Sequence, residues 1–280
     1  MNRSIITATN TLSQLQKQMD MISHNIANVD TTGFKRRQAT FTDLIFQEFR
    51  NQPNDITEQN RLTPLNIRQG TGAKINHSQV VMQQGSIKHT HRQLDTAFTA
   101  EGQFYRVLVQ NEDGTAVRYT RDGALYLTPV SENESMLVNG EGYPVLNENN
   151  QPITVAGSPK GFTITSEGRF IAEMANGGTQ EFNLGVTYIK KPQFLEQKGG
   201  NLFGLPDNLA GLGVAENDIL TNLDGQLRNG ISIQQGALEQ SNVDLSKEMT
   251  DLINVQRGYQ FQSRSITLSD QMLGLVNGIR

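Results

Sequence analysis

Residues 5–35 read IITATNTLSQLQKQMDMISHNIANVDTTGFK, and their apolar side chains recur at alternating gaps of three and four residues up to residue 26. This spacing is typical of one narrow stripe along a helix. The other faces carry Gln, Ser, Thr, Asn and Lys, so a helix of roughly 33 Å is predicted that is marginal alone and needs a partner. The stripe consists of Ile5, Ala8, Leu12, Leu15, Met19, Ile22 and Ile26.

Residues 28–33, NVDTTG, are predicted to end this helix. Gly33 can adopt a left-handed conformation there, which commonly terminates a helix. Phe34 follows the turn and is predicted to anchor the exit of the chain.

A similar stripe runs through the C-terminal end of the chain. Ser241 or Asn242 is the predicted N-cap, with Asp244 near the positive end of the helix dipole. Both terminal helices are predicted to carry this one stripe and no second apolar layer, so they pair with each other, with neighbouring subunits, or with both. The C-terminal stripe consists of Leu245, Met249, Leu252, Val255, Tyr259, Ile266 and Leu273.

The middle of the chain, from about residue 69 to 235, is predicted to be β structure. Short alternating runs, such as residues 104–109, 116–120 and 161–165, are separated by turn dipeptides. Many short strands with regular turns indicate an antiparallel sandwich or irregular barrel. The turn dipeptides, each expected to supply a positive φ for a tight hairpin, are Asp113-Gly114, Asp122-Gly123, Asn139-Gly140 and Asp224-Gly225.

The predicted fold is therefore α+β, with terminal helices forming a coiled-coil-like layer and a mainly antiparallel β domain inserted between them. Residues 1–45 form the N-terminal helix and its turn, packing with the C-terminal helix of residues 238–280. The polar, Pro-containing stretch 46–69 is predicted to be an extended arm, and residues 70–237 the β-rich central domain.

Composition excludes several classes of function. The chain has no cysteine and a net charge of −4, which argues against thiolate chemistry, Fe–S clusters and a nucleic-acid surface. No apolar run approaches the roughly 20 residues that cross a bilayer, and no cleaved secretory signal is predicted. His89 and His91 are too few for a metal site without nearby acids. We expect no cofactor, no metal, no small-molecule substrate and no enzymatic activity.

The residues that end the first helix resemble a signature of flagellar axial proteins, the rod and hook family, whose pattern is N-x-A-N-x-x-T-x-G-F/Y-K. The matching positions in this chain are Asn25, Ala27, Asn28, Thr31, Gly33, Phe34 and Lys35.

Three further segments are similar to the same family, in the family's order. They are LDTAF with EGQF (residues 94–98 and 101–104), YTRDG (119–123), and GALEQSNVD with QRGY (236–244 and 256–259). Gln103 and Gly258 depart from the family pattern, which usually has glycine or an aromatic residue near the first and alanine at the second. Residues 41–47 and the polar arm look most like distal rod members of the family.

The resemblance implies a structural subunit of the basal-body rod, which self-assembles into a helical homopolymer and transmits torque from motor to hook. Implied partners are other copies, other rod and hook proteins and the flagellar export apparatus. The implied location is the basal body, in the envelope outside the cytoplasmic membrane, reached by type III export. Alternatives are a proximal rod subunit, a hook-related axial protein, and a cell-wall-binding β domain that does not assemble. A glycan hydrolase would need an added catalytic domain, for which the chain has no spare length.

The candidate site is an assembly interface along the two stripes and the signature turn. Its predicted residues are Ile5, Leu12, Leu15, Met19, Ile22, Asn25, Ile26, Asn28, Gly33, Phe34, Leu245, Met249, Leu252, Val255, Tyr259, Ile266 and Leu273.

Overall fold

A computed structural model shows a mixture of helices and antiparallel sheets. It divides into two compact units, each assembled from segments that are distant in sequence. The helical unit contains residues 1–26, 37–79 and 245–280, and the β body contains residues 27–36 and 80–244. The structure describes residues 2–44, 47–49, 67–70, 72–111, 114–175, 177–206, 211 and 213–278.

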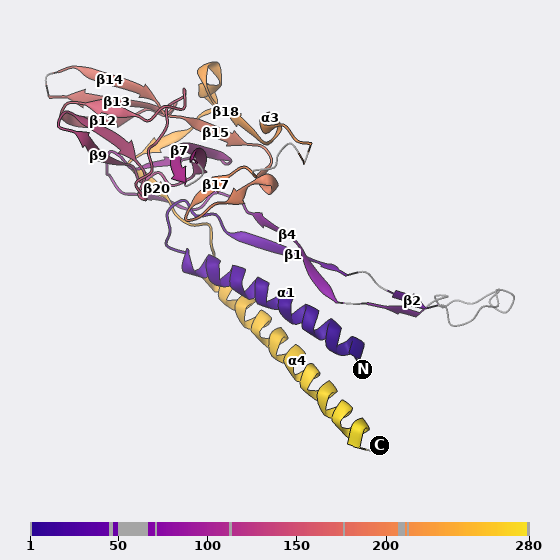
Figure 1. Cartoon of the computed structure of the whole chain (residues 1–280). Coiled ribbons are helices and arrows are strands. Elements are labelled where there is room, and N and C mark those ends of the chain that lie inside the picture. Colours follow the sequence, from indigo (N-terminus) through magenta and orange to yellow (C-terminus); the bar gives the residue numbers. More distant parts are fainter. Residues whose placement is uncertain are drawn as a thin grey trace. The chain divides into compact units, whose positions relative to one another are not determined.

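The helical unit contains the two long helices predicted from the stripes. Helix α1 spans Asn2–Ala27 and α4 spans Leu245–Gly278, and the two lie side by side (Figure 1). They run antiparallel, because Asn25 near the end of α1 contacts Glu248 at the start of α4, and Leu15 lies against Gly258. Helices at both ends of the chain are thus confirmed. None of the described helices is long and apolar enough to cross a membrane.

Helix α1 also contacts a two-stranded ribbon through a second row of side chains, which accept hydrogen bonds from it. The ribbon pairs β1 (Arg37–Asp43) with β4 (Ala73–Val80). Gln14 accepts a hydrogen bond from the Ile75 amide at 3.0 Å, and Met21 Sδ accepts one from Ser78 at 3.8 Å. Since Gln14 and Met21 are seven residues apart, they share one face of α1, beside the apolar stripe.

The strands before residue 69 are a difference from the sequence prediction. Besides β1, the strands β2 (Gln47–Phe49) and β3 (Ile67–Gln69) pair with each other in the region expected to be an irregular arm. Polar strands of a narrow ribbon lack the apolar alternation on which the prediction depended. The rest of the predicted arm, residues 50–66, lies outside the described residues.

The β body is built around a six-stranded antiparallel sheet with the order β16-β17-β8-β7-β15-β18. Two three-stranded sheets, β11-β10-β9 and β12-β13-β14, and the pairs β19-β6 and β20-β5 complete it. Its strands are β5 (Ile87–His89), β6 (Thr96–Phe98), β7 (Gln103–Asn111), β8 (Gly114–Thr120), β9 (Tyr126–Ser131), β10 (Glu134–Val138), β11 (Thr154–Ala156), β12 (Pro159–Ile164), β13 (Arg169–Met174), β14 (Thr179–Asn183), β15 (Val186–Ile189), β16 (Glu196–Gln197), β17 (Leu202–Gly204), β18 (Leu220–Asn222), β19 (Ile233–Gln235) and β20 (Ala237–Glu239). Short helical segments lie at Pro192–Phe194 (η2), Glu216–Ile219 (α3) and Gly225–Gly230 (η3).

Strand β7 is buried on both faces and organises the core. Tyr105, Val107 and Val109 point to one side, where they join the main apolar cluster around Phe170. Phe104 points to the other side and packs in a second cluster with Phe203, their ring centroids 5.7 Å apart. The alternation follows from the two-residue period of a strand.

Only two of the four turn dipeptides supply the positive φ angle that was expected of them. Gly114 and Gly225 have positive φ angles, as predicted, whereas Gly123 and Gly140 do not. In the turn after Asn139 the positive φ lies at Gly142, with a φ of 87°, and the Asn139 side chain accepts hydrogen bonds from the amides of Glu141 and Tyr143. Gly123 has a different role, described below. Asp113 lies outside the described residues.

Candidate functional site

The two predicted stripes face each other within the helical unit. Ile22 and Val255 are buried, with 5% and 7% of their surface exposed. At Gly258 an added Cβ would lie 3.7 Å from Leu15 Cδ1, which is ordinary van der Waals contact, so Leu15 packs over this position of α4. The half-buried predicted residues of the two stripes are Ile5, Leu12, Leu15, Met19, Ile26, Leu252, Tyr259, Ile266 and Leu273.

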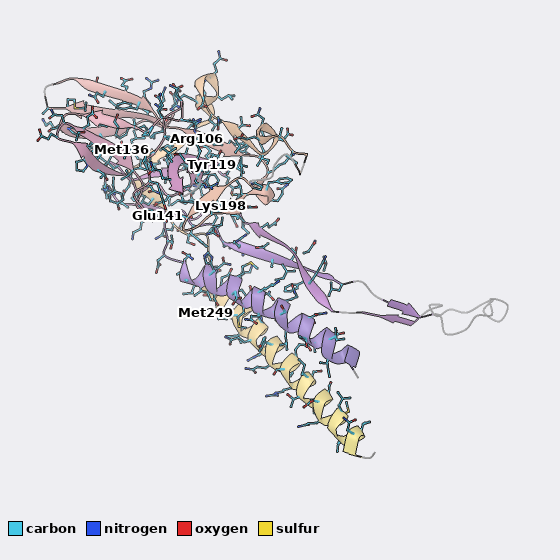
Figure 2. All side chains as sticks on the ribbon, in the orientation of Figure 1. Arg106, Tyr119, Met136, Glu141, Lys198 and Met249 are labelled. Carbon is cyan, nitrogen blue, oxygen red and sulfur yellow. The ribbon has the colours of Figure 1, made fainter. Side chains whose placement is uncertain are left out.

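Leu245 and Met249 do not belong to this seam. Their exposed fractions are 43% and 45%, and Figure 2 shows Met249 at the surface of α4. Between them, Glu248 takes the inward position and is 4% exposed. The inward positions that continue the seam are Glu248, Leu252, Val255, Tyr259, Gln262, Ile266, Ser269 and Leu273, at gaps of four and three residues.

Asn25 is the polar anchor at the end of the seam. Its side chain accepts a hydrogen bond from the Arg37 amide at 3.0 Å and donates to the Arg37 carbonyl at 2.9 Å. It also donates to Glu248 at 3.2 Å, in a buried contact. The Asn25 side chain is therefore hydrogen-bonded both to the strand that follows the signature turn and to the first turn of α4.

The remainder of the signature, residues 28–35, belongs to the β body. Asn28 closes the turn through its side chain, which accepts a hydrogen bond from Thr31 at 3.2 Å. Gly33 has a φ of 66°, and a Cβ there would lie 2.6 Å from the Arg121 carbonyl carbon. Phe34 is 2% exposed. The predicted left-handed glycine and aromatic anchor are thus both found.

Beyond Phe34 the structure brings together three charged residues that the sequence places in three separate motifs. Lys35 Nζ lies 2.6 Å from Glu239 Oε1, and Arg121 Nε lies 2.6 Å from Glu239 Oε2. All three side chains are at most 1% exposed. We call Lys35, Arg121 and Glu239 the signature cluster. It was not predicted, because charged side chains are usually solvated and these lie far apart in sequence.

The cluster is strongly hydrogen-bonded to backbone. Arg121 donates to the carbonyls of Gln103 and Ala100, each at 2.9 Å, and Lys35 donates to that of Gln83 at 2.9 Å. Burial lowers the pKa of Lys35, and the attraction of Glu239 only partly opposes this effect. Taking charges out of water costs several kcal/mol per ion. A buried ion pair offsets this cost only if further hydrogen bonds satisfy its charged groups, as they do here.

Asn242 joins three chain segments beside the cluster. Its side chain accepts a hydrogen bond from the Arg36 amide at 2.7 Å and donates to the carbonyls of Val81 and Gln83, each at 2.9 Å. The predicted N-cap role of Ser241 or Asn242 is wrong, because α4 begins only at Leu245. Residues 242–244, Asn-Val-Asp, have the composition of a helix N-cap. The Asn242 side chain is instead hydrogen-bonded to Arg36, Val81 and Gln83.

Asp122, next to Arg121, accepts hydrogen bonds from Thr32 Oγ1 at 2.8 Å and from the Ala124 amide at 3.1 Å. Burial raises the pKa of the Asp122 carboxyl, although these hydrogen bonds oppose the shift. Folded protein therefore holds this proton more tightly than the unfolded chain. The resulting stabilisation is present below the ordinary pKa of 3.8 and is lost as the pH rises through the raised value.

Asp122→Asn keeps the accepting oxygen and removes the charge, so we expect a higher free energy of unfolding than wild type at pH 7. The difference should shrink as the pH falls towards 3, because the wild-type carboxyl is then protonated. Urea denaturation across this pH range measures it, with Asp30→Asn, at an exposed position, as control. A constant offset between Asp122→Asn and wild type at all pH values would contradict the assignment.

The outer face of α4 is a second feature that the sequence analysis missed. Exposed apolar side chains follow the i, i+4 spacing of a helix ridge, first at Leu245, Met249 and Ile253, then at Leu268, Met272 and Val276, with Phe261 and Leu275 beside them. Phe261 and Leu275 are each 69% exposed. The prediction of one stripe and no second apolar layer is wrong for α4. We call these eight side chains the outer face.

Contrary to the expectation from the sequence, His89 and His91 do not lie on one strand. His89 ends β5, and His91 follows it with a φ of 60°. Among the described residues no three His, Cys, Asp or Glu side chains are grouped as a metal would require.

Comparisons with known proteins agree on one family. Residues 5–35 match the family model described as "Flagella basal body rod protein", and residues 234–279 match "Flagellar basal body rod FlgEFG protein C-terminal". The chain is 45% identical to the flagellar hook-basal body complex protein FlhP of Bacillus subtilis, over all of both chains. It is 34% identical to the flagellar basal-body rod protein FlgG of Borreliella burgdorferi, over 100% of this chain and 99% of that one. Identity to FlgG of Bacillus subtilis is 33%, over 98% and 97%.

Proposed function

The chain belongs to the flagellar basal-body rod protein family, and on that premise we propose that it is a structural subunit of the rod that polymerises through its terminal helices. Membership supports the function predicted from the signature residues. The relatives named FlgG agree with a distal rod position, and the relative named FlhP shares more of the sequence. The observation that carries the polymerisation step is the outer face of α4.

That helix is poorly buried for its length. It has 34 residues, of which only Glu248, Val255 and Ser269 are buried, although it is about 51 Å long. A helix exposing apolar ridges along such a length gains stability by packing against another helix. A second copy supplies a helix of the same kind, and a heterologous contact between unlike faces repeats without closing, which builds an open helical tube.

In this assembly the seam and the outer face have different tasks. The seam between α1 and α4 holds the terminal helices together as a coiled-coil-like pair of the hook and rod type. The outer face binds α1, α4 or both from neighbouring copies. The predicted site residues of the stripes act by shaping this pair, and their direct contact with another copy stays a prediction.

The remaining parts of the prediction are proposals on the same basis. Within the predicted domains of residues 1–45 and 238–280, the helices of residues 2–27 and 245–278 form the assembly layer. Residues 46–69 form an arm towards neighbours, and the predicted domain of residues 70–237 supplies most of the β body. The subunit reaches the basal body, outside the cytoplasmic membrane, by the flagellar export route. Its partners are other copies, other rod and hook proteins and the export apparatus. Torque passes through many contacts in parallel, and no residue takes part in a chemical reaction.

Phe261→Asp tests the outer face directly. We expect this variant to stay monomeric under conditions in which the wild type forms straight tubes in electron microscopy, because a charge on the ridge opposes burial between copies. Gln260→Asp, which adds the same charge at the adjacent exposed position, should still assemble. Circular dichroism should show the same helix content for the three proteins.

Leu252→Asp tests the seam, and we expect it to lose both helix content and assembly because Leu252 packs within the pair. If Phe261→Asp forms tubes like the wild type, the outer face is not the contact between copies. If none of the proteins assembles at any concentration, the polymerisation proposal itself fails.

A further inference from the structure

The signature cluster has an uneven distribution of charge between three parts of the chain. Glu239 belongs to the C-terminal segment, which we define as residues 237–242, and Lys35 to the N-terminal segment, residues 27–36. Arg121 lies in the middle of the sequence. One carboxylate thus faces two cations, each at 2.6 Å from a different oxygen.

The two terminal segments are not equivalent in this arrangement. Without Lys35, Glu239 still pairs with Arg121, and its Oε1 still accepts the Gly85 amide at 2.9 Å. That arrangement is neutral and hydrogen-bonded. Without Glu239, Lys35 would be buried with the Gln83 carbonyl as its hydrogen-bond acceptor and the repelling Arg121 close by, while the attraction of Glu101 is the weakest influence on it. Burying an unpaired ammonium is strongly unfavourable.

Backbone hydrogen bonds join the two segments, although the N-terminal segment also contacts the rest of the β body. The Val81 amide donates to the Arg36 carbonyl at 2.9 Å, and the Asn201 side chain donates to the Thr32 carbonyl at 2.6 Å. The N-terminal segment binds the C-terminal one, since the Gly33 amide donates to the Glu239 carbonyl at 2.8 Å and the Arg36 amide donates to Asn242. The C-terminal segment has independent support, because β20 pairs with β5 and the Gln240 amide donates to the Ser86 carbonyl at 2.8 Å. One segment is therefore part of the surface on which the other docks.

We propose that Glu239 is a latch that orders the closure of the β body: the C-terminal segment docks first and supplies the counter-charge without which the N-terminal segment, with its buried Lys35, does not dock stably. The last part of the β body to close is then the part nearest the start of the chain. A chain lacking its C-terminal segment keeps residues 27–36 undocked. This inference concerns the single chain and does not depend on polymerisation.

Hydrogen exchange of the full-length protein, resolved by peptide, tests the order. In the wild type we expect amides of residues 27–36 to open at least tenfold more often than those of residues 237–242. Residues 169–174 of β13, in the core, report global unfolding. If the C-terminal segment opens as often as the N-terminal one, or more often, the proposed order is wrong.

Three variants test the latch itself. Glu239→Gln should reduce protection of residues 27–36 at least tenfold, while Lys35→Met should leave residues 237–242 as in the wild type. The double variant Lys35→Met/Glu239→Gln should regain protection of residues 27–36 over Glu239→Gln alone, because the unpaired ammonium is gone. Equal loss in both segments for Lys35→Met, or no recovery in the double variant, would overturn the proposal. Should Glu239→Gln unfold globally, the wild-type hierarchy and Lys35→Met still decide it.

Discussion

Gly123→Ala should destabilise the β body by at least about 3 kcal/mol, combining overpacking with lost hydrogen bonds. An added Cβ at Gly123 would lie 1.8 Å from the Thr96 carbonyl oxygen and 2.8 Å from its carbonyl carbon. Neither atom can move alone, because both are backbone. The Gly123 carbonyl also accepts hydrogen bonds from the Thr96 amide at 3.0 Å and from its hydroxyl at 3.2 Å.

Displacing Thr96 would spread the damage. Its side chain accepts a hydrogen bond from the buried Tyr105 hydroxyl at 2.8 Å, and its backbone lies opposite Gln235 in the β6–β19 pair. Strands from distant parts of the sequence therefore depend on the same close approach. Urea denaturation followed by circular dichroism in the strand region measures the loss.

Gly230→Ala is the matched control. No atom lies within 4 Å of a Cβ built there, so we expect a change within about 0.5 kcal/mol. Equal effects of the two substitutions would show that the contact between Gly123 and Thr96 is looser than the structure has it.

Gly123 also illustrates where sequence reasoning ends. An Asp-Gly dipeptide between strands predicts a tight turn with positive φ, and Asp224-Gly225 provides such a residue at the start of η3. At Gly123 the glycine is needed for space. Nothing in the local sequence separates the two reasons, because the atom that excludes a side chain belongs to Thr96.

The terminal helices could be predicted because their signal is local. Gaps of three and four residues identify the face of α1 whatever packs against it, and Gly33 marks the end of the same helix. On α4, following one stripe hid the outer face, although the spacing of Leu268, Met272 and Val276 is visible in the sequence. Tracing every i, i+4 row, and not only the seam, would have found it.

The signature cluster had a weaker signal. Lys35 and Glu239 are separated by 204 positions, and no periodicity connects them. The only sequence indication is that Lys35, Arg121 and Glu239 each stand inside a motif shared with the family. Motif residues that carry charge but lack any catalytic context are candidates for buried pairs, and here that interpretation would have joined three of the matched segments.

Arg121→Met should destabilise the β body by about 3 kcal/mol, the lower end of the cost of breaking a buried ion pair, because Lys35 remains to pair with Glu239. The guanidinium is the centre of several contacts. It donates to Glu239 and to the Gln103 and Ala100 carbonyls, and it lies 5.4 Å from the centroid of the Phe98 ring. Methionine fills much of the volume but leaves both carbonyls without this donor.

Arg121→Lys separates charge from geometry. The ammonium keeps the positive charge but lacks the planar fork that reaches Glu239 and two carbonyls together, so we expect an intermediate loss. Arg169→Met is the control, because the Arg169 side chain is 49% exposed and its carboxylate contacts are 3.8 and 4.0 Å long. Such a surface pair contributes at most about 1 kcal/mol. Chemical denaturation of the three variants and the wild type gives the comparison. If Arg121→Lys matches the wild type, charge alone holds the cluster; if Arg121→Met matches Arg169→Met, the cluster does not stabilise the fold, and the motifs that meet there must be retained for another reason.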